Sequence, residues 1–401
     1  MNRVAITGMG IVSPLGNSTG EMRHALREAK SGVGPITQVP LDKLSLRIGA
    51  EVKNFDPQAQ FGSRQLSLMD RCAQLAVAAS RQAVAQSGID FRADLGARAA
   101  AILGIGVGGM GTVEDCLYRL YAEGARRLHP LSIPKFMFSA PLSHITIEHG
   151  ITGPSFTVAS ACASANHAIG TAFQMVRAGM VDAAVTGGAE SVFTFGTLKG
   201  WEALRIMAPD MCRPFSKGRA GMVLGEGAGA FVLENMERAK ARGAEILGEI
   251  AGFGMSSDAY EIVQPSATGS SAAIAACLND AGLNPEDVDY INAHGTGTGA
   301  NDATETKAIR TAFGAAADKL AVSSTKSLHG HALGASGAIE LAATLIAMHD
   351  GFIPPTANYL GPDPECDLDY VPNEARDGKI GVALSNSFAF GGHNAVLAIR
   401  R

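Results

Sequence analysis

The sequence has few of the residues that mark nucleic-acid-binding or membrane proteins. Only 18% of its 401 residues are charged, 6% are aromatic, and the net charge is −5. Proteins that bind nucleic acid usually carry a basic surplus, so this balance argues against nucleic acid as a partner. The longest apolar stretch, ALGASGAIELAATLIAM, is interrupted by Glu340 and by small residues. It therefore predicts a buried helix rather than a membrane span.

Cysteine is scarce and never forms a CxxC pair. The six cysteines are Cys72, Cys116, Cys162, Cys212, Cys277 and Cys366. This scatter predicts neither a disulfide framework nor a zinc site, and a reducing cytoplasm is the simplest compartment. The N-terminal run MNRVAITGMGIVSPLG has too short an apolar stretch for a signal peptide and predicts a strand. We therefore expect a cytoplasmic protein without membrane insertion.

What the sequence does contain is glycine at the ends of short apolar runs. There are 48 glycines, and runs such as RVAITGMG, DAAVTGG and DYINAHGTG end in glycine turns. Ala-rich helical patterns such as DRCAQLAVAASRQAVAQSG lie between them. Strands and helices in alternation predict an α/β fold whose mostly parallel strands are covered by helices on both faces.

Two long segments repeat the same order of strand, small-residue turn and helix. They are FTVASACASANHAIGTAFQMVRAG and LAVSSTKSLHGHALGASGAIELAATLIAMHDG, and VAITGMGIVS and EIAGFGMSSD form a second matched pair. The pairs predict a duplication with one α/β half in residues 1–245 and the other in residues 246–401. The charged stretch ERAKARGAEI would join the halves as a solvated helix and linker.

The glycine patterns favour packing over nucleotide binding. Gly104, Gly106 and Gly109 fit GxGxxG after an apolar run, but no acidic residue follows at the end of a clear second strand about 20 residues on, as ribose binding would need. The sequence also has no GxxxxGK[ST] phosphate loop. We interpret these glycines as tight turns and places of close approach.

Cys162 is the one cysteine flanked only by small residues. It follows the strand pattern FTVAS and precedes a helix, so its thiol is expected near a helix N-terminus, where thiolate is stabilised. Small neighbours leave room for a substrate. A lone cysteine is nevertheless most often a buried core residue, and this stretch alone favours that interpretation.

Two further glycine-rich turns shift the interpretation of Cys162 from a core residue toward a nucleophile. INAHGTGTGANDATE places His294 after a strand, and SSTKSLHGHALGASGAIE contains Lys326, His329 and His331. Strand ends are where open α/β sheets place their sites, and nucleophilic catalysis needs partners that manage protons and charge. Metal binding is the rival use of such residues, but no carboxylate or third ligand lies at a usual short spacing.

Four separated motifs together resemble the elongating β-ketoacyl-acyl-carrier-protein synthases. They are ACASANHAIG, INAHGTGTGANDATE, STKSLHGHALGASG and NSFAFGGHNA, and the similarity covers nearly the whole chain. The resemblance implies a thiolase-like fold with two duplicated βα halves in a five-layer α/β/α/β/α arrangement. It also implies a homodimer, with a heterodimer as the alternative. No cofactor is implied, because the substrates are carried on the phosphopantetheine arm of acyl carrier protein (ACP).

The resemblance implies a role for each matching catalytic residue. Cys162 corresponds to the nucleophile that accepts the acyl chain. His294 and His331 correspond to the pair that engages malonyl-thioester and stabilises the enolate left by loss of CO₂, as an oxyanion hole does. Lys326 corresponds to a lysine that supports the histidines, and Glu340 to a buried carboxylate near it.

Further correspondences concern the substrate channel and the surface. Phe390 matches the gate, and its backbone N–H, with that of Cys162, matches the oxyanion hole of the acyl-cysteine. Thr296 and Thr298 match phosphopantetheine-binding hydroxyls, and Val107 and Trp201 match the acyl pocket. The expected ACP-docking arginines are Arg64, Arg126, Arg127 and Arg205. Some relatives hold a structural monovalent cation, here at Asn292, Glu340, Ser385 and Asn386, and no other metal is implied.

The chain also departs from the family pattern. DAYEIV, residues 258–263, stands where a DAYHMT-like run is usual, so Val263 lacks a hydroxyl and Glu261 adds a charge. The segment RIMAPDMCR is short, and its region resembles the rhizobial nodulation ketosynthases. A ketosynthase for a specialised lipid or polyketide chain is therefore the alternative. A non-catalytic subunit like the chain-length factors would lack the cysteine, and a thiolase would need a second late cysteine that NSFAFGGHN does not provide.

Overall fold

The computed structural model describes all 401 residues and contains one ten-stranded mixed sheet. The strands run in the order β10-β9-β13-β14-β8-β1-β7-β6-β4-β5. Their bounds are β1 Val4–Val12, β4 Ala99–Gly104, β5 Ser155–Val158, β6 Ala183–Glu190, β7 Gly227–Asn235, β8 Gly248–Ser257, β9 Tyr290–Asn292, β10 Ala321–Ser323, β13 Val382–Ala389 and β14 His393–Arg400.

The two halves of the sheet have the same topology. The first half is β1-β7-β6-β4-β5 and the second is β8-β14-β13-β9-β10, so each half places its first, last, fourth, second and third strand side by side in that order. The halves meet at a short antiparallel pairing of β1 with β8, from Val4↔Ile250 to Ile6↔Gly248. β1 and β8 contain the matched sequence pair noted above. The exact boundary after residue 245 stays a prediction.

The expectation of a mostly parallel sheet was wrong. Five of the nine strand pairings are antiparallel and four are parallel. Helices cover both faces, so strands of either direction are apolar on both sides. Composition therefore reports the burial of a strand and not its direction.

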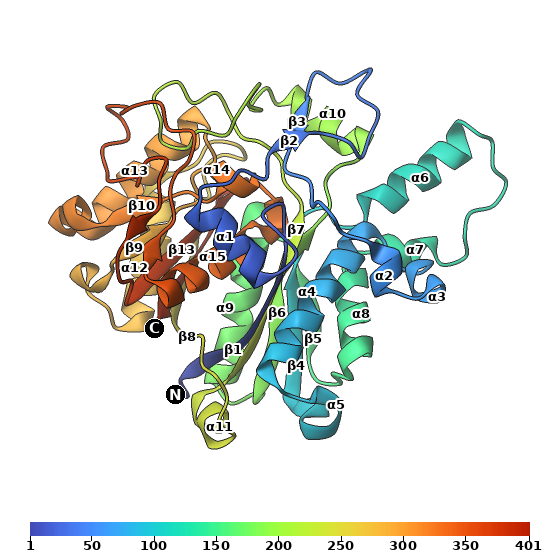
Figure 1. Cartoon of the computed structure of the whole chain (residues 1–401), viewed down its shortest axis with the longest axis horizontal. Coiled ribbons are helices and arrows are strands. Elements are labelled where there is room, and N and C mark those ends of the chain that lie inside the picture. Colours follow the sequence, from blue (N-terminus) through green and yellow to red (C-terminus); the bar gives the residue numbers. More distant parts are fainter.

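Helices form three layers around the two halves of the sheet (Figure 1). The outer layer on the first half is α4 (Arg71–Ser87) and α8 (Ala140–His149), and the outer layer on the second is α12 (Ala267–Ala281) and α13 (Gly299–Phe313). The middle layer is α9 (Ser164–Arg177) and α15 (Ser336–Asp350), which pack on each other and on strands of both halves. The arrangement is the expected five-layer α/β/α/β/α core.

Small residues in the middle helices let both sheets approach, and α15 is buried on every side up to its last turn. Every residue of α15 from Ser336 to Met348 is buried. A Cβ on Gly170 of α9 would lie 2.4 Å from the ring of Phe253 on β8. A helix that is apolar all round belongs in the centre of a large core, so the long apolar run is a buried helix as predicted.

Shorter elements surround this core. The charged stretch after β7 forms α11 (Met236–Ala241), as expected. The other α-helices are α1 Thr19–Arg27, α2 Pro57–Gln60, α3 Ser63–Leu66, α5 Phe91–Asp94, α6 Met110–Tyr121, α7 Ser132–Phe136, α10 Phe195–Ala203 and α14 Lys326–His329. Minor strands are β2 Gly34–Pro35, β3 Ile48–Gly49, β11 Phe352–Ile353 and β12 Arg376–Asp377. The 3₁₀ helices are η1 Gly96–Arg98, η2 Ala161–Ala163, η3 Pro285–Asp287, η4 Gly314–Lys319 and η5 Leu333–Ala335. None of the helices is both long and apolar enough to cross a bilayer.

Candidate active site

Cys162 lies in a sharp turn between β5 and α9. It is the middle residue of η2, and the preceding Ala161 has a left-handed φ of 50°. Such a backbone costs about 1–3 kcal/mol for a non-glycine residue and is typical of functional sites. Gly104 makes room for the turn, because a Cβ there would lie 2.4 Å from the backbone N of Ala165. The turn places the thiol beside the N-terminus of α9, as predicted.

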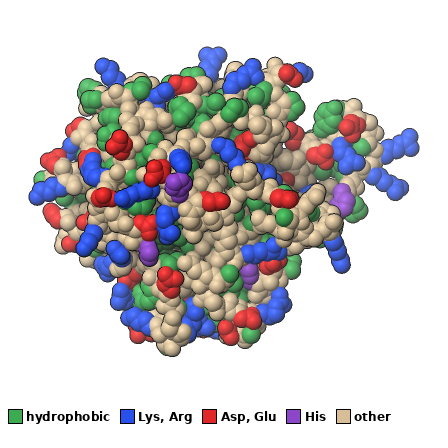
Figure 2. All heavy atoms as spheres, viewed as in Figure 1, with side chains coloured by type: hydrophobic (Ala, Val, Ile, Leu, Met, Phe, Trp, Pro, Cys, Tyr) green, Lys and Arg blue, Asp and Glu red, His purple; other side chains and the backbone are tan.

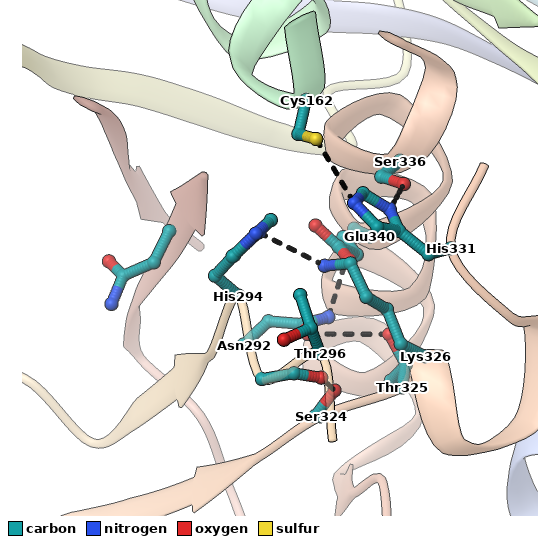
Figure 3. Close-up of polar contacts among 12 residues, drawn as sticks. Cys162, Asn292, His294, Thr296, Ser324, Thr325, Lys326, His331, Ser336 and Glu340 are labelled. Carbon is teal, nitrogen blue, oxygen red and sulfur yellow. Dashed lines mark hydrogen bonds and ion pairs between the residues drawn. The ribbon is translucent and has the colours of Figure 1, made fainter. Parts of the chain in front are cut away.

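His331 lies directly beside the thiol. Its Nε2 is 3.1 Å from Cys162 Sγ and its Nδ1 is 2.8 Å from the hydroxyl of Ser336, the first residue of α15 (Figure 3). The backbone N–H of His331 donates to Val223 O over 2.7 Å. The backbone hydrogen bond to Val223 and the contact of Nδ1 with Ser336 therefore fix the position of the His331 ring.

His294 faces His331 from a different turn. It follows β9, and its ring stands edge-on to that of His331 with 5.4 Å between centroids. The backbone N–H groups of His294 and Gly295 donate to the carboxylate of Glu305 on α13, over 2.8 and 2.7 Å. Sequence reasoning missed Glu305, although it lies within the motif INAHGTGTGANDATE.

Lys326 connects the histidines to a buried carboxylate. Its Nζ lies 3.4 Å from Nδ1 of His294 and forms an ion pair with Glu340 on α15. Both charged side chains are completely buried. Burial raises the pKa of the Glu340 carboxyl, and the neighbouring Lys326 ammonium opposes that rise. The structure thus brings together all four residues assigned to the catalytic centre.

The histidines are neutral in this environment. Burial, followed by the positive charge of Lys326, lowers the pKa of both His294 and His331 well below the ordinary value. An ammonium donates hydrogen bonds and accepts none, so Nδ1 of His294 must be the acceptor and Nε2 holds the proton. The hydroxyl of Ser336 can donate to Nδ1 of His331 in the same way, which leaves a proton on that Nε2.

The thiol differs from the expectation of a stabilised thiolate. Burial raises the pKa of Cys162 to about 12, with a further rise from Glu190. Lys326 and the backbone N–H groups of Cys162 and Phe390 act in the opposite direction. Desolvation of the charged form outweighs the helix terminus, so Cys162 is a thiol at rest.

A cavity of about 190 Å³ opens onto these groups. Thr296 and Thr298 line it, and their hydroxyls are 2.9 Å apart. Phe390 also lines it and stacks on Trp201, with 6.0 Å between ring centroids and 23° between planes. Val107 does not line this cavity but packs against the apolar cluster that contains Cys162.

The loop of Phe390 has a backbone that only glycine adopts readily. Gly391 and Gly392, between β13 and β14, have φ values of 82° and 71°. Left-handed φ values suit glycine because it has no Cβ. The half-buried ring of Phe390 thus stacks on Trp201 at the cavity, and the left-handed turn at Gly391 and Gly392 directs the chain away after it.

The candidate cation site is formed only in part. Asn292 on β9 pairs directly with Ser385 on β13, and Asn292 Nδ2 donates to the backbone oxygen of Glu340 over 3.2 Å. Buried side-chain oxygens of Glu340 and Ser385 have no hydrogen-bond partner. Oxygen atoms of this kind suit a hard cation as ligands. Asn386 is next along β13 and donates to Glu305, so it lies on the opposite face of the sheet.

The four surface arginines lie on three separate elements. Arg64 is on α3, Arg126 and Arg127 are between α6 and α7, and Arg205 follows α10. All four are exposed and none forms a salt bridge. Their charges are therefore not paired within the chain.

The fold and the cysteine–histidine–histidine–lysine centre define a condensing enzyme of the thiolase-like class. Residues 1–239 match the model of the beta-ketoacyl synthase N-terminal domain, and residues 247–360 match that of the C-terminal domain. The chain therefore belongs to the β-ketoacyl synthase family, whose members are acyltransferases.

Known relatives span the whole chain. Nodulation protein E of Rhizobium sp. (strain N33) is 49% identical over 399 residues, covering 100% of this chain and 99% of the relative. The 3-oxoacyl-[acyl-carrier-protein] synthase 2 of Staphylococcus aureus (strain COL) is 41% identical over 406 residues, covering 100% and 98%.

Solved structures agree on the fold. The ishigamide ketosynthase/chain length factor is 36% identical with a TM-score of 0.95, covering 100% of this chain and 99% of the other. A type II polyketide ketosynthase in complex with its acyl-carrier protein is 29% identical with a TM-score of 0.91, again covering 100% and 99%.

Proposed function

We propose that the protein is an elongating β-ketoacyl-ACP synthase. It condenses an acyl chain held on Cys162 with malonyl-ACP to give 3-oxoacyl-ACP, CO₂ and free ACP in fatty acid elongation. The observation that carries this proposal is the contact of Cys162 Sγ with His331 Nε2, with His294 and Lys326 adjoining it. Belonging to the β-ketoacyl synthase family supports the reaction class.

In the first step, Cys162 takes the acyl chain. Its sulfur attacks the thioester carbonyl of acyl-ACP, the thiol proton goes to the departing phosphopantetheine sulfur, and free ACP leaves. The developing oxyanion is held by the backbone N–H groups of Cys162 and Phe390, both of which act on the sulfur in the resting site. Burial keeps the resting sulfur protonated, so the thiol proton has to leave as the sulfur attacks.

In the second step, malonyl-ACP loses CO₂. The electron pair of the broken C–C bond moves onto the thioester as an enolate. His294 and His331 each present a neutral Nε2–H to the enolate oxygen, since Lys326 and Ser336 occupy the two Nδ1 atoms. The enolate carbon then attacks the acyl-cysteine, and the Cys162 sulfur departs as a thiolate and takes a proton from solvent.

The substrates would reach the site along the cavity. Thr296 and Thr298 line it and present hydroxyls to a phosphopantetheine arm. Phe390 acts as the gate between this arm and the acyl pocket near Val107 and Trp201. The four free arginines are the proposed contacts for the acidic carrier protein. A monovalent cation, where bound, would be structural and held by Asn292, Glu340 and Ser385.

We propose a homodimer formed through the projecting α6–α7 region. β5 is one of the two edge strands of the sheet, and large apolar side chains are exposed on it, on α6, on α7 and just after α7. They include Leu117, Tyr118, Tyr121, Ile133, Phe138 and Phe156. Figure 2 shows that Lys and Arg side chains lie at the outer end of this projection. A large exposed apolar surface marks an interface, and a related ketosynthase chain is the alternative partner. The expected compartment is the cytoplasm.

The decisive test replaces the nucleophile. Purified Cys162→Ala is given acyl-ACP and malonyl-ACP, and 3-oxoacyl-ACP is measured by mass spectrometry. We expect no condensation, whereas Cys277→Ala, which removes a buried thiol of α12, keeps the wild-type rate. Condensation by Cys162→Ala at the normal rate would show that the proposal is wrong.

A specialised ketosynthase is the second candidate. The segment 258–263 supports it, because Ile262 and Val263 line the cavity and Val263 stands where the family pattern has a hydroxyl. Nodulation protein E is also one of the relatives. Mass spectrometry of Cys162 loaded from a mixed acyl-ACP pool distinguishes the two. Preference for one unusual chain supports this candidate, and loading of ordinary saturated chains supports the housekeeping role. A non-catalytic subunit would neither condense nor show selective labelling of Cys162 by iodoacetamide.

A further inference from the structure

Glu190 is a buried carboxylate that the proposed mechanism does not use. It is the last residue of β6 and has no solvent exposure. Its two oxygens accept hydrogen bonds from four backbone N–H groups and form no salt bridge. The donors are Gly106 at 2.8 Å, Val107 at 3.1 Å, Gly108 at 3.0 Å and Gly334 at 3.1 Å.

These donors come from the two halves of the molecule. Gly106–Gly108 follow β4 in the first half, and Gly334 lies in η5, just after His331 in the second. The two loops touch: a Cβ on Gly334 would lie 2.2 Å from the N of Gly106, and a Cβ on Gly106 would lie 2.3 Å from Glu190 Oε2. Glu190 is therefore the only side chain that hydrogen-bonds to both loops at their crossing.

Each loop carries a residue that packs near the nucleophile. Val107 packs against the apolar cluster of Cys162, and Leu333 is a buried member of that cluster. Leu333 also has a left-handed φ of 41°, so its backbone has to be held in place by neighbours. The hydrogen bonds of Glu190 fall on Val107 itself and on the residue after Leu333.

We propose that Glu190 is a positioning residue that locks these two loops together and thereby sets the length of chain that Cys162 accepts. A carboxylate is required because both of its oxygens accept N–H bonds. A glutamine would turn an NH₂ group either toward the Oε2 donors Gly106 and Gly334 or toward the Oε1 donors Val107 and Gly108, and either orientation removes hydrogen bonds that hold the crossing. The inference rests on the proposed function in one respect, namely that the chain on Cys162 lies in the pocket beside Val107 and Leu333.

The experiment measures chain length at Cys162 without requiring condensation. N-alkyl iodoacetamides of increasing chain length alkylate the thiol and release iodide, and peptide mass spectrometry gives the rate at Cys162. Burial raises the pKa of Glu190 to about 7, so the assay is run at pH 8, where the carboxylate is ionised. We expect the wild-type rate to fall beyond a limiting length. In Glu190→Gln the limit is expected to shift, with at least a fivefold change in the ratio of long-chain to short-chain rates.

Two variants make the result specific. Glu190→Asp keeps the charge but is one methylene shorter, so it should lose part of these hydrogen bonds and also shift the limit. It serves as the test if Glu190→Gln does not fold. Glu234→Gln removes a buried carboxylate at the opposite end of the β6–β7 pair and should keep the wild-type limit. Folded Glu190 variants with the wild-type length profile would overturn the inference. A shifted profile in a protein that does not condense malonyl-ACP would contradict only the proposed function.

Discussion

Replacing Lys326 with methionine tests the buried charge pair that underlies the site. The change removes the ammonium and keeps an unbranched apolar chain. Lys326 is the only hydrogen-bond partner of Glu340 Oε1, and Oε2 of that carboxylate has none. Lys326→Met therefore leaves a fully buried carboxylate without any partner. Removing one member of a buried ion pair costs about 3–5 kcal/mol, which is the expected loss in free energy of unfolding.

The loss should depend on pH in a defined direction. Without Lys326, burial acts unopposed and the pKa of Glu340 rises further above its unfolded value. The folded variant then holds a proton that the unfolded chain has lost, so its stability falls as the pH rises from the unfolded pKa toward the folded one. We expect Lys326→Met to approach wild-type stability near pH 4.5 and to diverge from it by pH 8.

Urea denaturation at several pH values measures both effects, and a second variant separates stability from chemistry. Lys326→Met/Glu340→Gln removes both charges and should recover most of the stability. It should not recover malonyl-ACP decarboxylation, because Nδ1 of His294 still lacks its donor. Loss of one oxyanion donor costs roughly 10²–10³-fold in rate and sets the upper limit of that effect. A Lys326→Met protein within about 1 kcal/mol of wild type at pH 8, with an unchanged pH slope, would refute this reasoning.

Three further predictions follow from packing, burial and exposure. Gly104→Ala should destabilise by about 1–3 kcal/mol in urea denaturation, because its Cβ would lie 2.4 Å from the N of Ala165; Gly62→Ala, with no atom within 4 Å, should be neutral. The rate of Cys162 alkylation by iodoacetamide should rise about tenfold per pH unit from pH 7 to 9, because the thiol pKa is about 12, and a plateau near pH 7 would contradict this. Tyr121→Asp introduces a charge at a side chain that is 84% exposed in the single chain and lies in the proposed interface. Analytical ultracentrifugation should show a shift from dimer toward monomer, and an unchanged dimer would place the interface elsewhere.

Local pattern was sufficient for much of the fold and for the positions of the candidate site residues. The position of Cys162 at a helix N-terminus follows from a strand, a turn of small residues and an apolar helix within one stretch of chain. The placement of His294, Lys326 and His331 after strands follows from the same kind of pattern. These features depend on neighbours in sequence, and the structure places each of them as predicted.

Contacts between distant segments decided the rest. Strand direction did not follow from composition, since strands between two helix layers are apolar whichever way they run. The pKa of Cys162 depends on how completely the two halves bury it, and this burial outweighs the helix terminus that the sequence does reveal. Glu190 is an ordinary acid at the end of a strand until the fold brings the backbone N–H groups of Gly106 and Gly334, from separate halves, to one oxygen of its carboxylate.

The sequence by itself determined which residues are the candidates for the chemistry, because the four motifs that contain them, and the turns that present them, can be recognised from local pattern. The tertiary structure alone decided their protonation states and the crossing of loops near the acyl pocket. Those properties depend on desolvation and on hydrogen bonds between segments far apart in the chain, which no local pattern encodes.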